Sequence, residues 1–116
     1  NYINSDKRII SCDSGSKEVD VSKIIYIESS GHKVTYHIYG KEFGGYVVKS
    51  KLDDIENELK EYKYLLRVHQ SYIVNMMYVN NISSYRVYLK NGIDLGVPKS
   101  RYKEVKKRIL EFKENN

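Results

Sequence analysis

The sequence predicts a mostly β domain with short helices, and three observations support that prediction. Short runs of alternating apolar and polar residues, separated by turn-forming residues, occur in both halves of the chain. Apolar residues recur at helical spacing in only two segments, near residues 50–63 and 100–113. Twelve tyrosines accompany two phenylalanines and no tryptophan. Tyrosine joins an apolar ring to a polar tip, which suits thin β structures whose inward residues still reach the surface.

The length and the cysteine content bound the class of protein. A chain of 116 residues can bury one core without a metal or a disulfide, so we expect a single domain over residues 1–116. The lone cysteine, Cys12, cannot form an internal disulfide, which favours the cytoplasm. No apolar run is long enough for a signal peptide or a membrane span. The first residue is not methionine, so we expect a C-terminal piece of a longer protein.

The first half of the chain predicts strands joined by short turns. Residues 8–12 and 17–21 flank an Asp-Ser-Gly turn and predict a hairpin. Residues 24–28 are β-branched and aromatic, and Ser-Ser-Gly ends that strand. The next strand, residues 32–39, alternates in polarity, with three inward side chains: Val34, Tyr36 and Ile38. A further extended run, residues 42–48, contains Gly44-Gly45, which indicates a bulge or a close backbone approach.

The segment 50–63 predicts an amphipathic helix. Its apolar residues recur at spacings of three and four: Leu52, Ile55, Leu59 and Tyr62. Ser50 and Asp53 resemble a capping box at its start. The outer face is acidic: Asp53, Asp54, Glu56, Glu58 and Glu61. We therefore expect this helix to cover a sheet and to face away from any polyanion.

The second half predicts five strands and a last helix. The strands are residues 64–68, 72–75, 78–82, 85–89 and 93–97. Their alternation places Tyr85 inward and Tyr88 outward, and Asn91-Gly92 predicts a type I′ hairpin turn. Pro98 ends the last strand, and Ser100 is the predicted N-cap of a helix that reaches about residue 113. The helix has a narrow apolar stripe: Tyr102, Val105, Ile109 and Phe112.

Positive charge is concentrated in the last helix. Residues 99–113 hold seven Lys and Arg against two acids, and this excess of five equals the net charge of the whole chain. A local basic patch of this kind can neutralise phosphates and steer association with a polyanion. A solvated basic helix face is the alternative interpretation.

The sequence gives no support to an enzyme. It contains no phosphate-binding loop, no dinucleotide glycine fingerprint and no Gly-x-Ser-x-Gly elbow. His32, His37 and His69 lack metal-ligand spacing, and no motif supports a nucleophilic Cys12–His pair. We expect no catalytic activity, no metal and no cofactor.

A polar loop, His69-Gln70-Ser71, interrupts two apolar strands. Glutamine can pair with an adenine edge because it offers both a donor and an acceptor. We expect Gln70 to be exposed, and we expect His69 and Asn75 to bond within the fold, because both adjoin residues that look buried. Ser71 can cap the turn or reach a phosphate.

These residues belong to a run that resembles the LytTR family of bacterial transcription regulators. Residues 67–75, RVHQSYIVN, resemble its "R-x-H-x-S-(aromatic)-(aliphatic)-V-N" signature. Residues 24–28, IIYIE, resemble the family's early strand ending in glutamate. Residues 97–102, VPKSRY, are similar to its late "V-x-x-S-R" block. The matches span about residues 7–110 in the same order.

The resemblance implies an elongated domain of small antiparallel sheets that presents loops to successive grooves of duplex DNA. Carried over to this chain, the first contact position is His32, beside Lys33, and its placement requires a one-residue adjustment of that loop. The second is Gln70, beside Ser71, and the third is Arg101, beside Lys99 and Ser100. An ion pair from Arg101 to Glu104 or Glu111 and an ordinary turn histidine at position 32 are the structural alternatives.

The leading hypothesis is sequence-specific duplex DNA binding, as the output domain of a cytoplasmic two-component transcription regulator. The resemblance implies an upstream receiver domain in the full protein. The fragment alone should be a monomer that can pair on DNA repeats. The alternatives are an RNA or single-strand binder that stacks bases on tyrosines, and a protein-interaction module that uses strand edges. The tyrosine positions do not favour base stacking, because inward positions (Tyr36, Tyr85) are as common among them as outward ones (Tyr39, Tyr88).

Overall fold

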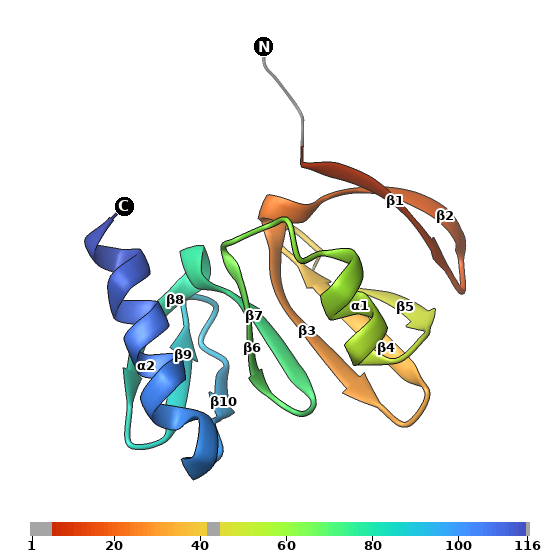
Figure 1. Ribbon diagram of the computed structural model, residues 1–116. Coiled ribbons are helices and arrows are strands. Elements are labelled where there is room, and N and C mark those ends of the chain that lie inside the picture. The colour runs from red at the N-terminus through yellow and green to blue at the C-terminus, as the bar shows by residue number, and fades with distance from the viewer. Residues whose placement is uncertain (1–5, 42–44, 116) are drawn as a thin grey trace.

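The mostly β prediction is confirmed by a computed structural model that describes residues 6–41 and 45–115. Within these residues the strands form three antiparallel sheets (Figure 1). A hairpin pairs β1 (Lys7–Cys12) with β2 (Gly15–Asp20). The central sheet has the order β5-β4-β3-β7-β6. Its members are β3 (Ile24–Ser30), β4 (Lys33–Ile38), β5 (Tyr46–Lys49), β6 (Leu65–His69) and β7 (Tyr72–Asn75).

The third sheet and the helices complete the domain. The sheet has the order β10-β9-β8, from β8 (Val79–Ser83), β9 (Arg86–Leu89) and β10 (Asp94–Gly96). The α-helices are α1 (Leu52–Glu58) and α2 (Lys99–Glu114). Two 3₁₀ turns, η1 (Val21–Lys23) and η2 (Met76–Tyr78), lead into β3 and β8. The principal extents are 39 × 39 × 26 Å, so the domain is extended along two axes and thin along the third.

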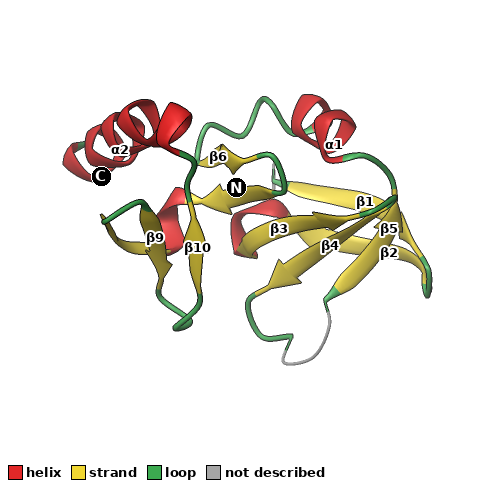
Figure 2. Cartoon of the chain, turned by 90° about the horizontal axis from the view of Figure 1, so that it is seen from below, coloured by secondary structure: helices red, strands yellow, loops and turns green. Residues whose placement is uncertain are grey.

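Two apolar clusters lie on opposite faces of the central sheet. Ile27, Val34 and Tyr36 pack with the apolar stripe of α1. Neighbouring positions such as Tyr26 and Val74 pack instead with the third sheet and with α2. Seen from below, α1 lies above the central strands, and α2 lies above β9 and β10 (Figure 2). Period-two alternation lets one sheet supply both clusters, because successive side chains point to opposite faces.

Helix α1 is shorter than predicted, and its capping box is absent. Its apolar stripe is buried as expected. However, Lys51 occupies the N-cap position in an extended conformation, and no side chain caps the helix. Ser50 continues the extended chain instead, because its amide N–H donates to the His32 carbonyl at 3.1 Å. Bonds at the other end, such as Tyr62 N–H to Leu59 O at 3.0 Å, form a tight turn where a further helical turn was predicted.

Helix α2 begins before its predicted cap. Ser100 lies inside the first turn and does not cap the helix, whereas extended Pro98 occupies the N-cap position. Proline has a fixed φ suited to a helix start, so the chain enters the helix without a polar cap. The predicted stripe is confirmed, with Val105 and Ile109 buried and Tyr102 and Phe112 half-buried.

The type I′ turn occurs at a different hairpin from the one that the sequence indicates. Asn91-Gly92 belongs to a three-residue loop closed by Leu89 and Ile93, in which Gly92 has a positive φ of 88° and Asn91 does not. The Asn91 side chain accepts the Ile93 N–H at 3.1 Å. Two positive φ angles, the mark of type I′, occur instead between β8 and β9, at Ser84 and Tyr85. Tyr85 is therefore an exposed turn residue, and its predicted inward position is wrong.

The remaining strand predictions differ in small ways. The β3 strand continues through Ser30, beyond its predicted end. Residues 42–44 lie outside the described residues, and β5 begins at Tyr46. The predicted close backbone approach is confirmed at Gly45, where an added Cβ would lie 1.9 Å from the Tyr36 carbonyl oxygen.

Candidate nucleic-acid interface

The topology brings several candidate turns to one end of the central sheet. β3 is antiparallel to both of its neighbours, so its last residues pair with the first residues of β4 and of β7. The end of β5 also lies here, because Lys33 pairs with Lys49. The β3–β4 turn, the β6–β7 turn and the chain entering α1 therefore share one end of the sheet. Figure 1 shows this end along the lower edge of the molecule, together with the start of α2.

The β3–β4 turn carries His32 in an exposed position. Gly31, with a φ of 62°, precedes it. The His32 carbonyl accepts the Ser50 N–H, which leaves the imidazole outside this contact. Lys33 is exposed beside it and lies opposite Lys49, so two cations flank this turn.

The β6–β7 turn holds Gln70 between two anchored residues. Nδ1 of His69 accepts the Ser71 N–H at 2.9 Å, and the Ser71 carbonyl accepts the Ser29 N–H at 2.9 Å. The His69 ring also lies 5.0 Å from the Tyr72 ring. Gln70 is exposed, so the predicted division between an anchored His69 and an outward Gln70 is confirmed.

Asn75 is a structural anchor, as predicted. Its side chain is fully buried and donates from Nδ2 to the Ser22 and Ile24 carbonyls, at 3.0 and 2.8 Å. Its Oδ1 accepts the Met77 N–H at 2.9 Å. Each contact joins β7 to a neighbouring segment, so Asn75 holds the base of the hairpin whose tip carries Gln70.

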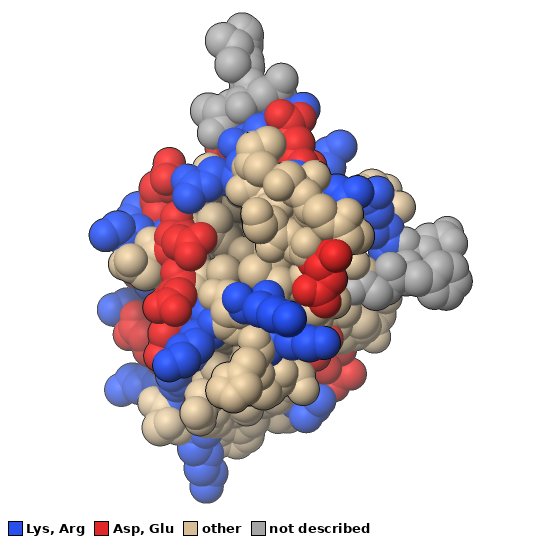
Figure 3. Space-filling view, turned by 90° about the vertical axis from the view of Figure 1, so that its right-hand side faces the viewer, with Lys and Arg blue, Asp and Glu red and all other residues tan. Residues whose placement is uncertain are grey.

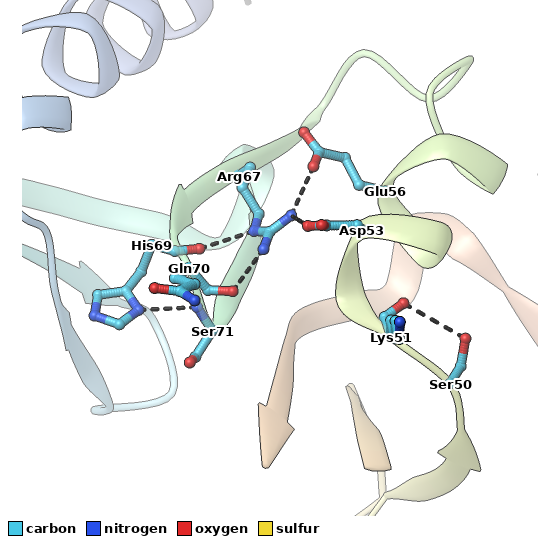
Figure 4. Close-up of polar contacts among 8 residues, drawn as sticks. All are labelled: Ser50, Lys51, Asp53, Glu56, Arg67, His69, Gln70 and Ser71. Carbon is cyan, nitrogen blue, oxygen red and sulfur yellow. Dashed lines mark hydrogen bonds and ion pairs between the residues drawn. The ribbon is translucent and has the colours of Figure 1, made fainter. Parts of the chain in front are cut away.

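Arg67 ties this turn to α1 (Figure 4). Its Nε donates to the His69 carbonyl at 2.8 Å and its Nη2 to the Gln70 carbonyl at 2.5 Å. Its Nη1 contacts Asp53 at 2.9 Å and Glu56 at 2.7 Å. The Arg67 side chain is only 9% exposed, so its charge is compensated within the fold.

The role of Arg67 was not predicted from the sequence, although one feature pointed to it. An arginine inside an apolar strand needs partners, and five carboxylates of opposite charge lay in the predicted helix that precedes it. Two acids of α1 therefore lie beside the predicted contact turn. Our expectation that this helix covers the sheet is confirmed, but its acids also hold the Gln70 turn.

The start of α2 carries the third group of predicted residues. Lys99, Ser100 and Arg101 are all exposed in its first turn. Within the described residues, no ion pair joins Arg101 to Glu104 or Glu111. Arg101 instead lines a cavity of about 330 Å³ together with Arg67 and Arg108, which links this helix to the β6–β7 hairpin.

A second hollow, of about 310 Å³, joins the two sheet turns. Gly31, Lys51 and Gln70 are among its lining residues. Lys49 and Lys51 are cations near the candidate turns that the sequence had not singled out, because strand pairing and packing bring them there. Figure 3 shows acidic side chains along the edge where α1 lies, with basic side chains near the centre of that face.

The opposite face of the turn strands carries a polar cluster. His37 Nε2 lies 2.6 Å from Glu28 Oε1, and the His37 ring stacks on Tyr26 with a centroid distance of 4.2 Å. Burial, and then the nearby Glu28 carboxylate, raises the pKa of Tyr26 to about 12. The Tyr26 hydroxyl is therefore neutral at physiological pH.

Comparison with known proteins identifies the family. The sequence model of the family described as the LytTr DNA-binding domain matches residues 14–110 of this chain. The chain belongs to the LytTR family. LytTR domains are DNA-binding modules and not enzymes.

Two relatives of this LytTR domain support the assignment. Over 97 residues it is 33% identical to the sensory transduction protein LytT of Bacillus subtilis (strain 168), a match that covers 78% of this chain. The matched part is 38% of LytT, so the chain spans well under half the length of that relative. A solved LytTr DNA-binding domain from Bacillus cereus, assigned to a methyl-accepting/DNA response regulator, superposes with a TM-score of 0.69 at 22% identity. That match covers 91% of this chain and 97% of the other, and it supports the fold.

Two further features of the described residues bear on the site. Neither α1 nor α2 has the length and apolar character needed to cross a bilayer. Within residues 6–41 and 45–115, no three His, Cys, Asp or Glu side chains come together as a metal site would require.

Proposed function

We propose that this LytTR domain binds duplex DNA at specific sequences through three points on one edge. The points are the β3–β4 turn with His32 and Lys33, the β6–β7 turn with Gln70 and Ser71, and the start of α2 with Lys99, Ser100 and Arg101. The observation that carries the proposal is the β6–β7 turn, where bonds from His69 and Arg67 fix the backbone while Gln70 stays exposed. A side chain held out by a fixed backbone loses little entropy on contacting a base edge.

Each point has a distinct chemical role in this proposal. Gln70 offers a donor and an acceptor to adenine, and Arg101 can bind guanine bidentately or enter a narrow minor groove. Lys33 and Lys99 neutralise phosphates and supply the salt-dependent part of the affinity. Loops at one edge of a flattened domain can meet neighbouring grooves on a single face of the duplex.

We also propose that the domain is the output part of a two-component transcription regulator in the cytoplasm, with an upstream receiver domain. The match to a sensory transduction protein of more than twice this length supports this proposal. We propose that the 116 residues form one domain, which is a monomer in solution and pairs only on repeated DNA sites.

A competition experiment tests the nucleic-acid class directly. A labelled duplex, selected by the domain from a randomised pool, is competed with unlabelled selected duplex, random duplex, single strand and RNA at one salt concentration. The selected duplex should compete best. Stronger competition by single strand or RNA would favour the base-stacking alternative.

Gln70→Ala tests the contact residue, and His69→Ala is its control. Gln70→Ala should leave the melting temperature nearly unchanged, because an exposed truncation shifts stability by about 0.5 kcal/mol at most. Affinity for the selected duplex should fall by about 1–3 kcal/mol, roughly 5- to 150-fold. His69→Ala should lower the melting temperature first. If Gln70→Ala unfolds the domain while His69→Ala abolishes only binding, the two roles are reversed.

A further inference from the structure

The β8–β9 turn has a backbone conformation that its residues do not favour. Ser83 pairs with Arg86, so Ser84 and Tyr85 form a two-residue loop, with φ angles of 51° and 62°. Such loops prefer asparagine and glycine, because a side chain in the left-handed region clashes with the backbone. A tyrosine in this conformation is a genuine outlier among bulky residues. Residues held in such conformations often belong to functional sites, which raises the question of what Tyr85 contacts.

The turn lies beside the third point of the proposed interface. The Tyr85 carbonyl accepts the Val97 N–H at 2.9 Å, just before the start of α2. The Tyr85 ring lies 4.5 Å from the ring of Tyr102, the residue after Arg101. In Figure 1 the turn between β8 and β9 lies along the same lower edge as the start of α2.

The phenol of Tyr85 is available to a ligand. Tyr85 is 46% exposed. Within the described chain, its hydroxyl has no hydrogen-bond partner. The surroundings are basic, since Lys99 and Arg101 are exposed nearby and Lys106 lies 5.9 Å from the Tyr102 ring centroid. A tyrosine hydroxyl in a basic setting can donate a hydrogen bond to a phosphate oxygen, as it does in protein–DNA complexes.

We propose that Tyr85 is a fourth contact of this edge with DNA, in which its hydroxyl donates to a backbone phosphate beside the groove that Arg101 enters. This inference rests on the proposed function and adds a residue outside its three points. The Tyr85 ring packs on the Tyr102 ring, which restricts the positions that the hydroxyl can take. A purely structural role, in which the ring only holds α2 against β9, is the competing explanation.

Tyr85→Phe separates the two explanations, because it keeps the ring, its packing and the backbone conformation and removes only the hydroxyl. Tyr39→Phe is the matched control. Tyr39 is 65% exposed and comes directly after β4, at the end of that strand that lies away from the His32 turn. Affinity is measured for the selected duplex and for a random duplex of equal length, over a range of salt concentrations, together with the melting temperature.

Tyr85→Phe should weaken binding about 3- to 10-fold and by the same factor on both duplexes, because a phosphate contact carries no sequence information. The melting temperature and the salt dependence should not change, since the substitution removes no positive charge that would displace counterions from DNA. Tyr39→Phe should bind as the wild type does.

Three results would overturn this inference alone, and a fourth would overturn the proposed function with it. Unchanged binding by Tyr85→Phe, with normal binding by the wild type, would remove the contact and leave the proposed function standing. A lower melting temperature with a parallel loss of affinity would assign the hydroxyl to folding. A loss confined to the selected duplex would exclude a phosphate as the partner. If the wild type binds no duplex at all, the proposed function fails as well.

Discussion

The two helices of this domain carry opposite charges, and they differ in how those charges are used. Helix α1 has four acids and no base, and two of the acids, Asp53 and Glu56, pair with Arg67. Helix α2 has seven basic residues against three acids, and among the described residues none of its side chains forms an ion pair. Acids of α1 therefore form ion pairs within the fold, whereas the basic side chains of α2 are left unpaired and can contact solvent or a polyanion.

The comparison shows that composition alone does not define an electrostatic surface. Arg67 is shared by Asp53 and Glu56, so it offsets one of their two negative charges and reduces their long-range effect. The field of an unpaired ammonium on an exposed helix is offset by no partner charge, and salt screens it over about a Debye length, roughly 8 Å at physiological ionic strength. DNA approaching this domain should respond to α2 strongly and to Asp53 and Glu56 weakly.

Removing Arg67 should produce the largest effect, because Arg67 is the ion-pair partner of Asp53 and Glu56 on α1. Arg67→Met leaves two carboxylates and two turn carbonyls without their donor, and should lower the free energy of unfolding by roughly 2–3 kcal/mol. Chemical denaturation measures this loss. Arg8→Met is the control, because Arg8 pairs with Glu61 in a more exposed setting and should cost less than about 1 kcal/mol. Equal losses in both variants would show that Arg67 is no special anchor.

Arg101→Ala tests whether an unpaired positive charge of α2 contacts DNA. If Arg101 reads a base, affinity for the selected duplex should fall by roughly 1–3 kcal/mol, with a smaller loss on random DNA. Lys103→Ala, two residues further along the same helix, should weaken both duplexes only slightly. Equal losses on both duplexes with Arg101→Ala would reassign Arg101 to the phosphate backbone.

Glu56→Gln tests whether an acid of α1 acts through Arg67. The glutamine keeps the shape but weakens the charge-assisted contact, so stability should fall by about 1 kcal/mol, and affinity should fall modestly as the Gln70 turn loosens. Glu58→Gln is matched to it, because Glu58 lies two residues away and forms no ion pair with a described residue. The two variants are compared by thermal melting and duplex binding. Indistinguishable behaviour would mean that the Glu56 contact is screened by solvent.

The smallest predicted effect distinguishes the two ends of α2. Lys99→Gln at its start should reduce the slope of log affinity against log salt concentration by about one, as expected for one lost phosphate contact. Lys113→Gln at its end should leave the slope unchanged, because Nζ of Lys113 donates to the Val79 carbonyl at 2.9 Å, away from the proposed edge. A similar change in both variants would place the whole of α2 along the DNA.

Patterns that depend on near neighbours in the sequence were predicted well. Alternating polarity gave the β4 strand and its inward side chains, and helical spacing gave the buried stripes of α1 and α2. The RVHQSYIVN run identified the family and the division of roles between an anchored His69 and an exposed Gln70. These features follow from side-chain period and local bonding, which act over a few residues.

The tertiary structure alone decided which residues meet. Asn91-Gly92 favours a type I′ turn, yet the register of β8 and β9 imposes that geometry on Ser84 and Tyr85, and α2 packs against the resulting turn. Arg67 and Glu56 are 11 residues apart in the chain and meet only because α1 covers the sheet beside β6. Packing of the two cores fixes register and partner choice, because burying both apolar faces outweighs the preference of any single turn or cap.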